Sequence, residues 1–188
     1  MLVGIDTQPQ ITEDKKLIPI NKYNLQLMSF GFINAQNAPT IWRGPMVSRM
    51  TQQFFEQVEW GSLDFLILDL PPGTGDIQLT LVQKLALTGA VIVTTPQKLA
   101  LLDVKKGADM FNKVNTPVLG VIENMTHFMC PHCDEKTKIF PGEGGIDESV
   151  RLDVPLLGRI YLSPELSEST ENGMPYVIKY EDTTISSE

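Results

Sequence analysis

The sequence feature that most constrains the fold is an apolar run that a pair of prolines ends. The run covers residues 63–70 (LDFLILDL), and Pro71 follows it directly. Its apolar residues do not alternate with polar ones, which predicts a strand covered on both faces, as the strands of parallel sheets are. The segments 90–95 (AVIVTT) and 117–123 (PVLGVIE) have the same character. Together the three segments predict a buried parallel sheet.

Helical patterns lie between these predicted strands. One covers residues 76–88 and ends at Gly89, and another covers residues 99–114. The apolar face of the second helix consists of Leu101, Val104, Ala108 and Phe111. The strand ends recur about every 30 residues, the length of a βαβ unit with one crossover helix. We therefore expect an α/β fold with a doubly wound, mostly parallel sheet.

A further strand and helix are predicted downstream. The strand covers 156–162, and the helix after it has Ser163 as N-cap, Pro164 in its first turn and Gly173 beyond its end. The interval before this strand is longer than the others. It contains an insertion at about 126–145, called the cysteine insertion below, which holds both cysteines of the chain.

The N-terminal part gives weaker signals. A strand at 25–30, a turn at 42–45 (WRGP) and a helix at 46–58 are predicted there. We expect residues 1–180 to form a single domain and residues 181–188 to form a frayed polar tail.

The composition excludes several classes of function. The 188 residues include 15 basic and 23 acidic side chains, and the net charge of −8 argues against binding to nucleic acid or to an anionic membrane. No apolar run approaches the roughly 20 residues that span a bilayer, and we expect no secretion signal. Two cysteines do not make a disulfide framework, so a reducing, cytoplasmic environment is expected.

Asp69 is a candidate ligand of a metal ion. Ligands of open α/β sheets bind at the carboxyl ends of strands, and a carboxylate there can hold a hydrated Mg²⁺ ion. Gly73 and Gly75 would let backbone N–H groups approach a phosphate. Alternatively, Asp69 caps a turn that the glycines only permit. Gln78 breaks a GxGxxG pattern, and no glycine of the chain precedes a lysine, so a Walker A motif is absent.

Cys130 and Cys133 form a C-x-x-C motif (CPHC). Two thiolates at this spacing can bind one metal ion or cluster, but a closed site of soft ligands usually has four. Either His127 and His132 complete a zinc site, or two chains each donate a pair across a symmetry axis. A redox-active dithiol would start a long helix, whereas a short polar stretch follows Cys133. Two ordinary thiols in a loop are the remaining alternative.

Asn124 follows the strand predicted at 117–123 and could bind the edge of a purine through its amide. Asparagine after a strand is more often a turn residue, so the purine role is only one of two interpretations.

Several motifs together resemble one known family, the Mrp-type iron–sulfur cluster carrier ATPases, which are related to ParA and MinD. The resemblance extends from about Ile18 to Tyr176. The motifs that carry it are WRGP at 42–45, VEWGSLD at 58–64, DLPPGTGD at 69–76, LTGAVIVTTP at 87–96, VLGVIENM at 118–125 and CPHC at 130–133.

The resemblance implies a function and a set of roles. Asp69 would serve Mg²⁺, the Gly73 loop would sense the γ-phosphate, and Asn124 would contact adenine. Cys130 and Cys133 would bind a 4Fe–4S cluster bridged between the two subunits of a homodimer. Mg-ATP binding would then control delivery of the cluster to apo iron–sulfur proteins, in the cytoplasm or, for a eukaryotic source, in mitochondria.

The sequence also departs from that family. Family members begin with a strand and a GKGGVGK[ST] loop, and this sequence starts downstream of both. We expect a partial P-loop NTPase domain that does not hydrolyse ATP alone, with strands 63–70 and 90–95 either closing together or leaving unpaired backbone groups between them. Rival functions are a zinc-binding interaction module and a thiol oxidoreductase.

Overall fold

The computed structural model describes residues 4–5, 7–33, 52–70, 76–142 and 144–187. The chain divides into two compact units. Residues 5–81 form one unit, and residues 82–188 together with residues 1–4 form the other. Each unit is described by itself.

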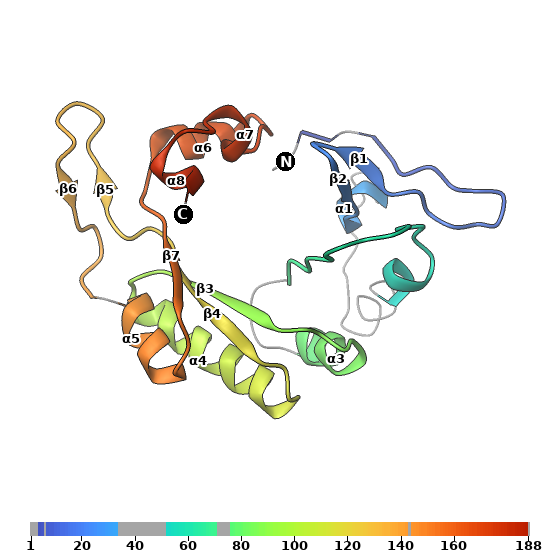
Figure 1. The fold of residues 1–188 in the computed structure, drawn as a ribbon, viewed down its shortest axis with the longest axis horizontal. Coiled ribbons are helices and arrows are strands. Elements are labelled where there is room, and N and C mark those ends of the chain that lie inside the picture. The colour runs from blue at the N-terminus through green and yellow to red at the C-terminus, as the bar shows by residue number, and fades with distance from the viewer. Residues whose placement is uncertain (1–3, 6, 34–51, 71–75, 143, 188) are drawn as a thin grey trace. The chain divides into compact units, whose positions relative to one another are not determined.

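A three-stranded parallel sheet is the centre of the larger unit (Figure 1). Its strands are β3 (Ala90–Thr94), β4 (Val118–Glu123) and β7 (Leu156–Arg159), in the order β3-β4-β7. Helix α4 (Lys98–Lys113) is the crossover between β3 and β4, and α5 (Gly144–Leu152) packs against β4, β7 and α4. The predicted parallel α/β architecture is confirmed.

Strand β3 is covered on one face only among the described residues, which corrects the expectation of two covered faces. Ala90, Ile92 and Thr94 are buried, whereas Val91 and Val93 are 44% and 60% exposed. The buried side chains face α4, because side chains alternate between the two faces of a strand. No described strand pairs with the second edge of β3.

Helices α3 and α4 agree with their sequence signals except at the end of α3. Helix α4 buries Ala108 and Phe111, as predicted, and Leu101 and Val104 of the same face are half-buried. Helix α3 (Asp76–Lys84) ends before the predicted residue 88, because residues 85–89 form the turns that lead into β3.

Three short helices follow β7, namely α6 (Pro164–Glu171), α7 (Tyr176–Lys179) and α8 (Thr184–Ser187). Ser163 is the N-cap of α6, and its hydroxyl accepts a hydrogen bond of 3.2 Å from the Leu166 amide. Gly173 has a φ of +64° beyond the end of α6, as its predicted place requires. Within the segment predicted as a polar tail, residues 184–187 form α8, and Ile185 there is only 8% exposed.

The smaller unit holds an antiparallel pair, β1 (Ile20–Lys22) and β2 (Leu25–Leu27), followed by α1 (Phe30–Ile33). The strand predicted at 25–30 thus ends early, and its last residue starts a helix. Residues 52–56 are helical, so the predicted helix at 46–58 ends two residues early, and its first part lies outside the described residues. The predicted turn at 42–45 also lies outside them.

The prediction of a buried strand at 63–70 is wrong in this structure. These residues are assigned to no strand, and Phe65 and Ile67 are 86% and 90% exposed. An apolar run becomes a buried strand only where a neighbouring strand pairs with its backbone and other elements cover its faces. The described residues supply neither for this segment.

Candidate metal centre at the tip of a hairpin

The cysteine insertion forms an antiparallel hairpin that extends beyond the sheet of its unit (Figure 1). Its strands are β5 (Phe128–Met129) and β6 (Lys136–Thr137), and both cysteines lie in the turn between them. The Cys130 amide donates to the Glu135 carbonyl at 3.1 Å, and the Asp134 amide donates to the Cys130 carbonyl at 2.9 Å. Both thiols are free, with Cys130 half-buried and Cys133 exposed.

The turn favours the thiolate form of Cys130. The backbone amide of His132, then the amide and the side chain of Cys133, hydrogen-bond the sulfur and lower the pKa of Cys130. Burial and the charge of Asp134 oppose this effect only in part. Because the thiolate is the form that binds metals, the turn is suited to a soft metal ion or cluster.

A single chain offers too few ligands for a closed site. Among the described residues, no group of three or more His, Cys, Asp or Glu side chains could hold a metal ion. His127 does not complete a site. Its Nδ1 lies 2.8 Å from the Thr126 hydroxyl and its ring stacks on Tyr161. The two thiolates at the tip are therefore the ligands that one chain provides.

His127 lies at the foot of the hairpin in a partly apolar environment. Its Nε2 atom is buried and has no hydrogen-bond partner within the described part of the chain. Burial lowers the pKa of His127, and the charges of Lys136 and Arg159 lower it further. The ring is therefore neutral at physiological pH.

The foot of the hairpin is joined to the chain beyond β7 by backbone hydrogen bonds. The Ile160 amide donates to the Glu123 carbonyl at 2.8 Å, and the Thr126 amide donates to the Ile160 carbonyl at 3.1 Å. The Leu162 amide donates to the His127 carbonyl at 2.8 Å. Backbone hydrogen bonds at its foot, and not only its two chain connections, thus join the hairpin to the sheet.

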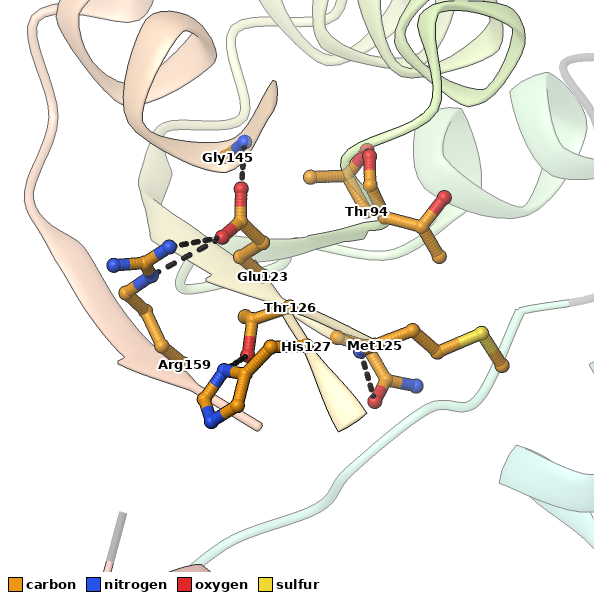
Figure 2. A network of polar contacts seen from close by, with 9 residues as sticks. Thr94, Glu123, Met125, Thr126, His127, Gly145 and Arg159 are labelled. Atoms are coloured by element: carbon orange, nitrogen blue, oxygen red, sulfur yellow. Dashed lines mark hydrogen bonds and ion pairs between the residues drawn. The ribbon is translucent and has the colours of Figure 1, made fainter. Parts of the chain in front are cut away.

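Glu123, the last residue of β4, is a buried acid that the sequence interpretation did not single out (Figure 2). One carboxylate oxygen accepts from the Gly145 amide at 2.6 Å, and the other accepts from Nε and Nη2 of Arg159 at 3.1 Å and 2.9 Å. The side chain is 0% exposed. A charged residue at the end of an otherwise apolar run was the available signal.

Asn124 lies beside this acid at the end of β4. Its amide donates to the Thr94 carbonyl at 2.7 Å, and its Oδ1 accepts from the Met125 amide at 2.9 Å. Met125 has a φ of +56°, so Asn124 caps a tight turn out of the strand. The turn role is thus observed, and the purine role stays a prediction.

The predicted site residues fall into two groups. Asn124, Cys130 and Cys133 lie on one continuous segment of the larger unit. Asp69 lies in the smaller unit, where it is exposed and does not end a strand. Gly73 lies outside the described residues, so the predicted magnesium and phosphate site stays a prediction.

Solved structures of nucleotide-binding proteins share the α/β fold of this chain. The cell-division ATPase MinD of Pyrococcus furiosus has the same fold, with a TM-score of 0.53 over 77% of this chain and 54% of its own, at 21% identity. A nucleotide-binding protein of Archaeoglobus fulgidus, solved in complex with ADP and with cobalt, is more similar. Its TM-score is 0.77 at 30% identity, over 95% of this chain and 68% of that chain.

The sequence then defines the family. The chain belongs to the ParA family of NUBPL iron-transfer P-loop NTPases, whose sequence pattern matches residues 1–188. The iron–sulfur cluster carrier protein of Aquifex aeolicus is 47% identical over 177 residues, 93% of this chain. The iron–sulfur protein required for NADH dehydrogenase of Arabidopsis thaliana is 41% identical over 186 residues, 99% of this chain. The chain spans 48% and 59% of the lengths of these two relatives.

The structure gives one result on membranes. Within the described residues, no helix combines the length and the apolarity that a bilayer crossing requires.

Proposed function

We propose that this chain carries an iron–sulfur cluster between two copies of itself and delivers it to apo iron–sulfur proteins. The observation that supports this most is the turn of the hairpin, where two thiols per chain lie at a projecting tip and amide groups stabilise a thiolate. A 4Fe–4S cluster takes four cysteine ligands, so two hairpins would supply a complete set. The cluster is the cargo, and Cys130 and Cys133 are the ligands.

ATP dependence belongs to the same proposal. The ADP complex of the Archaeoglobus protein, at 30% identity, supports a nucleotide site in this family member. Asp69 would serve Mg²⁺, the Gly73 loop would respond to the γ-phosphate, and Asn124 would contact adenine. Because these 188 residues contain no Gly-Lys pair, we expect no ATP hydrolysis by this chain alone.

Anaerobic reconstitution with iron and sulfide tests the cluster proposal. We expect four iron and four sulfide per two chains, together with a dimer in analytical ultracentrifugation. Cys130→Ser and Cys133→Ser should each abolish both results. His132→Ala lies in the same turn, keeps both thiols and should retain them. Stoichiometric zinc without iron uptake would instead indicate an interaction module.

The hairpin turn does not favour a thiol oxidoreductase. Strongly activated dithiols place their first cysteine at the start of a helix, where the dipole stabilises the thiolate. Here the motif lies between two short strands, and residues 130–135 contain no helix.

A further inference from the structure

The two ends of the cysteine insertion meet at one side chain. Glu123 is the last residue of β4, just before the insertion, and Gly145 lies at the start of α5, where the insertion ends. The bond of 2.6 Å from the Gly145 amide to the Glu123 carboxylate therefore closes the whole insertion at its base. It also satisfies an amide that has no partner within α5, since the first amides of a helix lack one.

A third element joins the same carboxylate. Arg159 at the end of β7 donates two hydrogen bonds to the other oxygen of Glu123 (Figure 2). The residue after Arg159 is Ile160, whose backbone groups bond both Glu123 and Thr126. The entry, the exit and the neighbouring strand of the hairpin thus all converge on Glu123.

Gly145 packs closely against the Glu123 side chain. A Cβ atom at Gly145 would lie 2.5 Å from Cβ of Glu123 and 3.0 Å from its Oε2. The Glu123 side chain is fully enclosed, so it cannot move into solvent to make room. Glycine at 145 is what allows α5 to start directly against the acid.

Burying an ion pair here is not explained by stability alone. Removing a carboxylate from water costs several kcal/mol, and a well-packed apolar group is often at least as stabilising as a buried pair. In addition, the hydrogen bonds of an ion pair have preferred angles. They therefore fix the orientation of β4, α5 and β7 relative to one another at this point.

We propose that Glu123 is a positioning residue for cluster binding, whose carboxylate fixes the base of the cysteine insertion and thereby the direction in which Cys130 and Cys133 project. This proposal rests on the proposed function for its cluster, but not for its effect on the hairpin. Two copies must present their thiols to one cluster at the same time. If the base of the hairpin is not fixed, the two thiols of each chain are less well oriented, and the cluster should dissociate faster.

The matched pair of variants is Glu123→Gln and Glu148→Gln. Glu148 is also buried, at 2% exposure, and is also paired with an arginine, Arg151. That pair lies within α5 and joins no ends of the insertion. Both substitutions keep the shape of the side chain and remove one buried charge. Arg159→Lys is the second variant, in case Glu123→Gln does not fold. Arg159 is partly exposed, and lysine cannot reproduce its two hydrogen bonds to Glu123, so this substitution weakens the same contact at the base of the insertion.

Two measurements read the result. Hydrogen exchange of the metal-free protein should be about tenfold faster in residues 126–142 for Glu123→Gln, since glutamine offers one uncharged oxygen where two carboxylate oxygens accept three hydrogen bonds. In the reconstituted protein, cluster loss to a chelator should accelerate by a similar factor, about tenfold. Glu148→Gln should change neither rate in the insertion, and Arg159→Lys should change both in the direction of Glu123→Gln.

The outcomes separate the two proposals. Equal exchange in residues 126–142 for the two glutamine variants would overturn the positioning role. Faster exchange with an unchanged rate of cluster loss would overturn its connection to the cluster. If the unmodified protein takes up no iron, the proposed function fails, and the exchange experiment still decides whether Glu123 fixes the hairpin.

Discussion

Gly145→Ala is the sharpest perturbation that the structure offers. The new methyl group would lie 2.5 Å from Cβ of a glutamate that is 0% exposed. Overpacking of this kind costs about 1–3 kcal/mol. Displacement of the carboxylate from the Gly145 amide adds roughly 1.5–3 kcal/mol, as expected for a hydrogen bond to a charged group. The better helix propensity of alanine returns at most about 1 kcal/mol. We therefore expect a loss of about 2–5 kcal/mol of unfolding free energy.

Urea denaturation measures this loss, and the probe has to report on the larger unit. Both tryptophans, Trp42 and Trp60, belong to residues 5–81, so their fluorescence reports on the other unit. Far-UV circular dichroism, checked by hydrogen exchange in α5, is the suitable readout. With a slope of about 2 kcal/mol per M, the midpoint should fall by about 1–2.5 M.

Gly31→Ala is the control for this experiment. Gly31 lies in helix α1, and a Cβ atom there would be 3.7 Å from the Ser29 hydroxyl, an ordinary contact. Its midpoint should stay the same or rise slightly. A Gly145→Ala protein as stable as the unmodified chain would refute the close packing of α5 against Glu123.

Three further predictions concern single groups. His132→Pro removes the backbone N–H that contributes most to lowering the pKa of Cys130. In the metal-free protein, the pH profile of alkylation of this thiol by iodoacetamide should therefore shift to higher pH. His132→Ala keeps the N–H and should leave the pH profile unchanged. Ser163→Ala removes the acceptor of the Leu166 amide and should cost about 1 kcal/mol in thermal unfolding, and a loss near zero would contradict the capping role. Burial lowers the pKa of His127 below its unfolded value of about 6.5, so its contribution to stability is complete above that pH and is lost as the pH falls through the folded pKa. His127→Gln should therefore flatten this part of the stability–pH curve, measured by urea denaturation between pH 5 and 8, and an unchanged curve would contradict the burial of the ring.

Elements whose signals are local agree with the sequence predictions. Helix α4 was predicted at 99–114 and is found at Lys98–Lys113, because its apolar periodicity and its ends depend on the helix itself. The N-cap at Ser163 is equally local, since the hydroxyl bonds an amide three residues away. The short strands β3 and β4 agree as well, and α4, which connects them, also packs against them.

The segment 63–70 shows where local signals are insufficient. Its composition is as apolar as that of β3 and β4, yet Ile67 is 90% exposed. A strand is defined by its hydrogen bonds to a neighbour, and a sequence pattern shows only that a segment is compatible with one. For the same reason Asp69, whose predicted role depended on the end of that strand, gains no support from the fold.

The site was predictable to the extent that its residues are close in sequence. Cys130 and Cys133 lie in one turn, so their spacing alone brings them together, whereas Glu123 and Gly145 are 22 residues apart. The alternation of side chains along β4 explains where Glu123 lies. Side chains of a strand alternate, so Glu123 must lie on the same face of β4 as Val121, and both are 0% exposed. A carboxylate buried on that face requires donors from whatever covers it, which are here the first turn of α5 and an arginine of the neighbouring strand. The acid at the end of this strand is thus satisfied by the helix to which the cysteine insertion returns and by the neighbouring strand, two contacts that depend on the fold and not on local sequence.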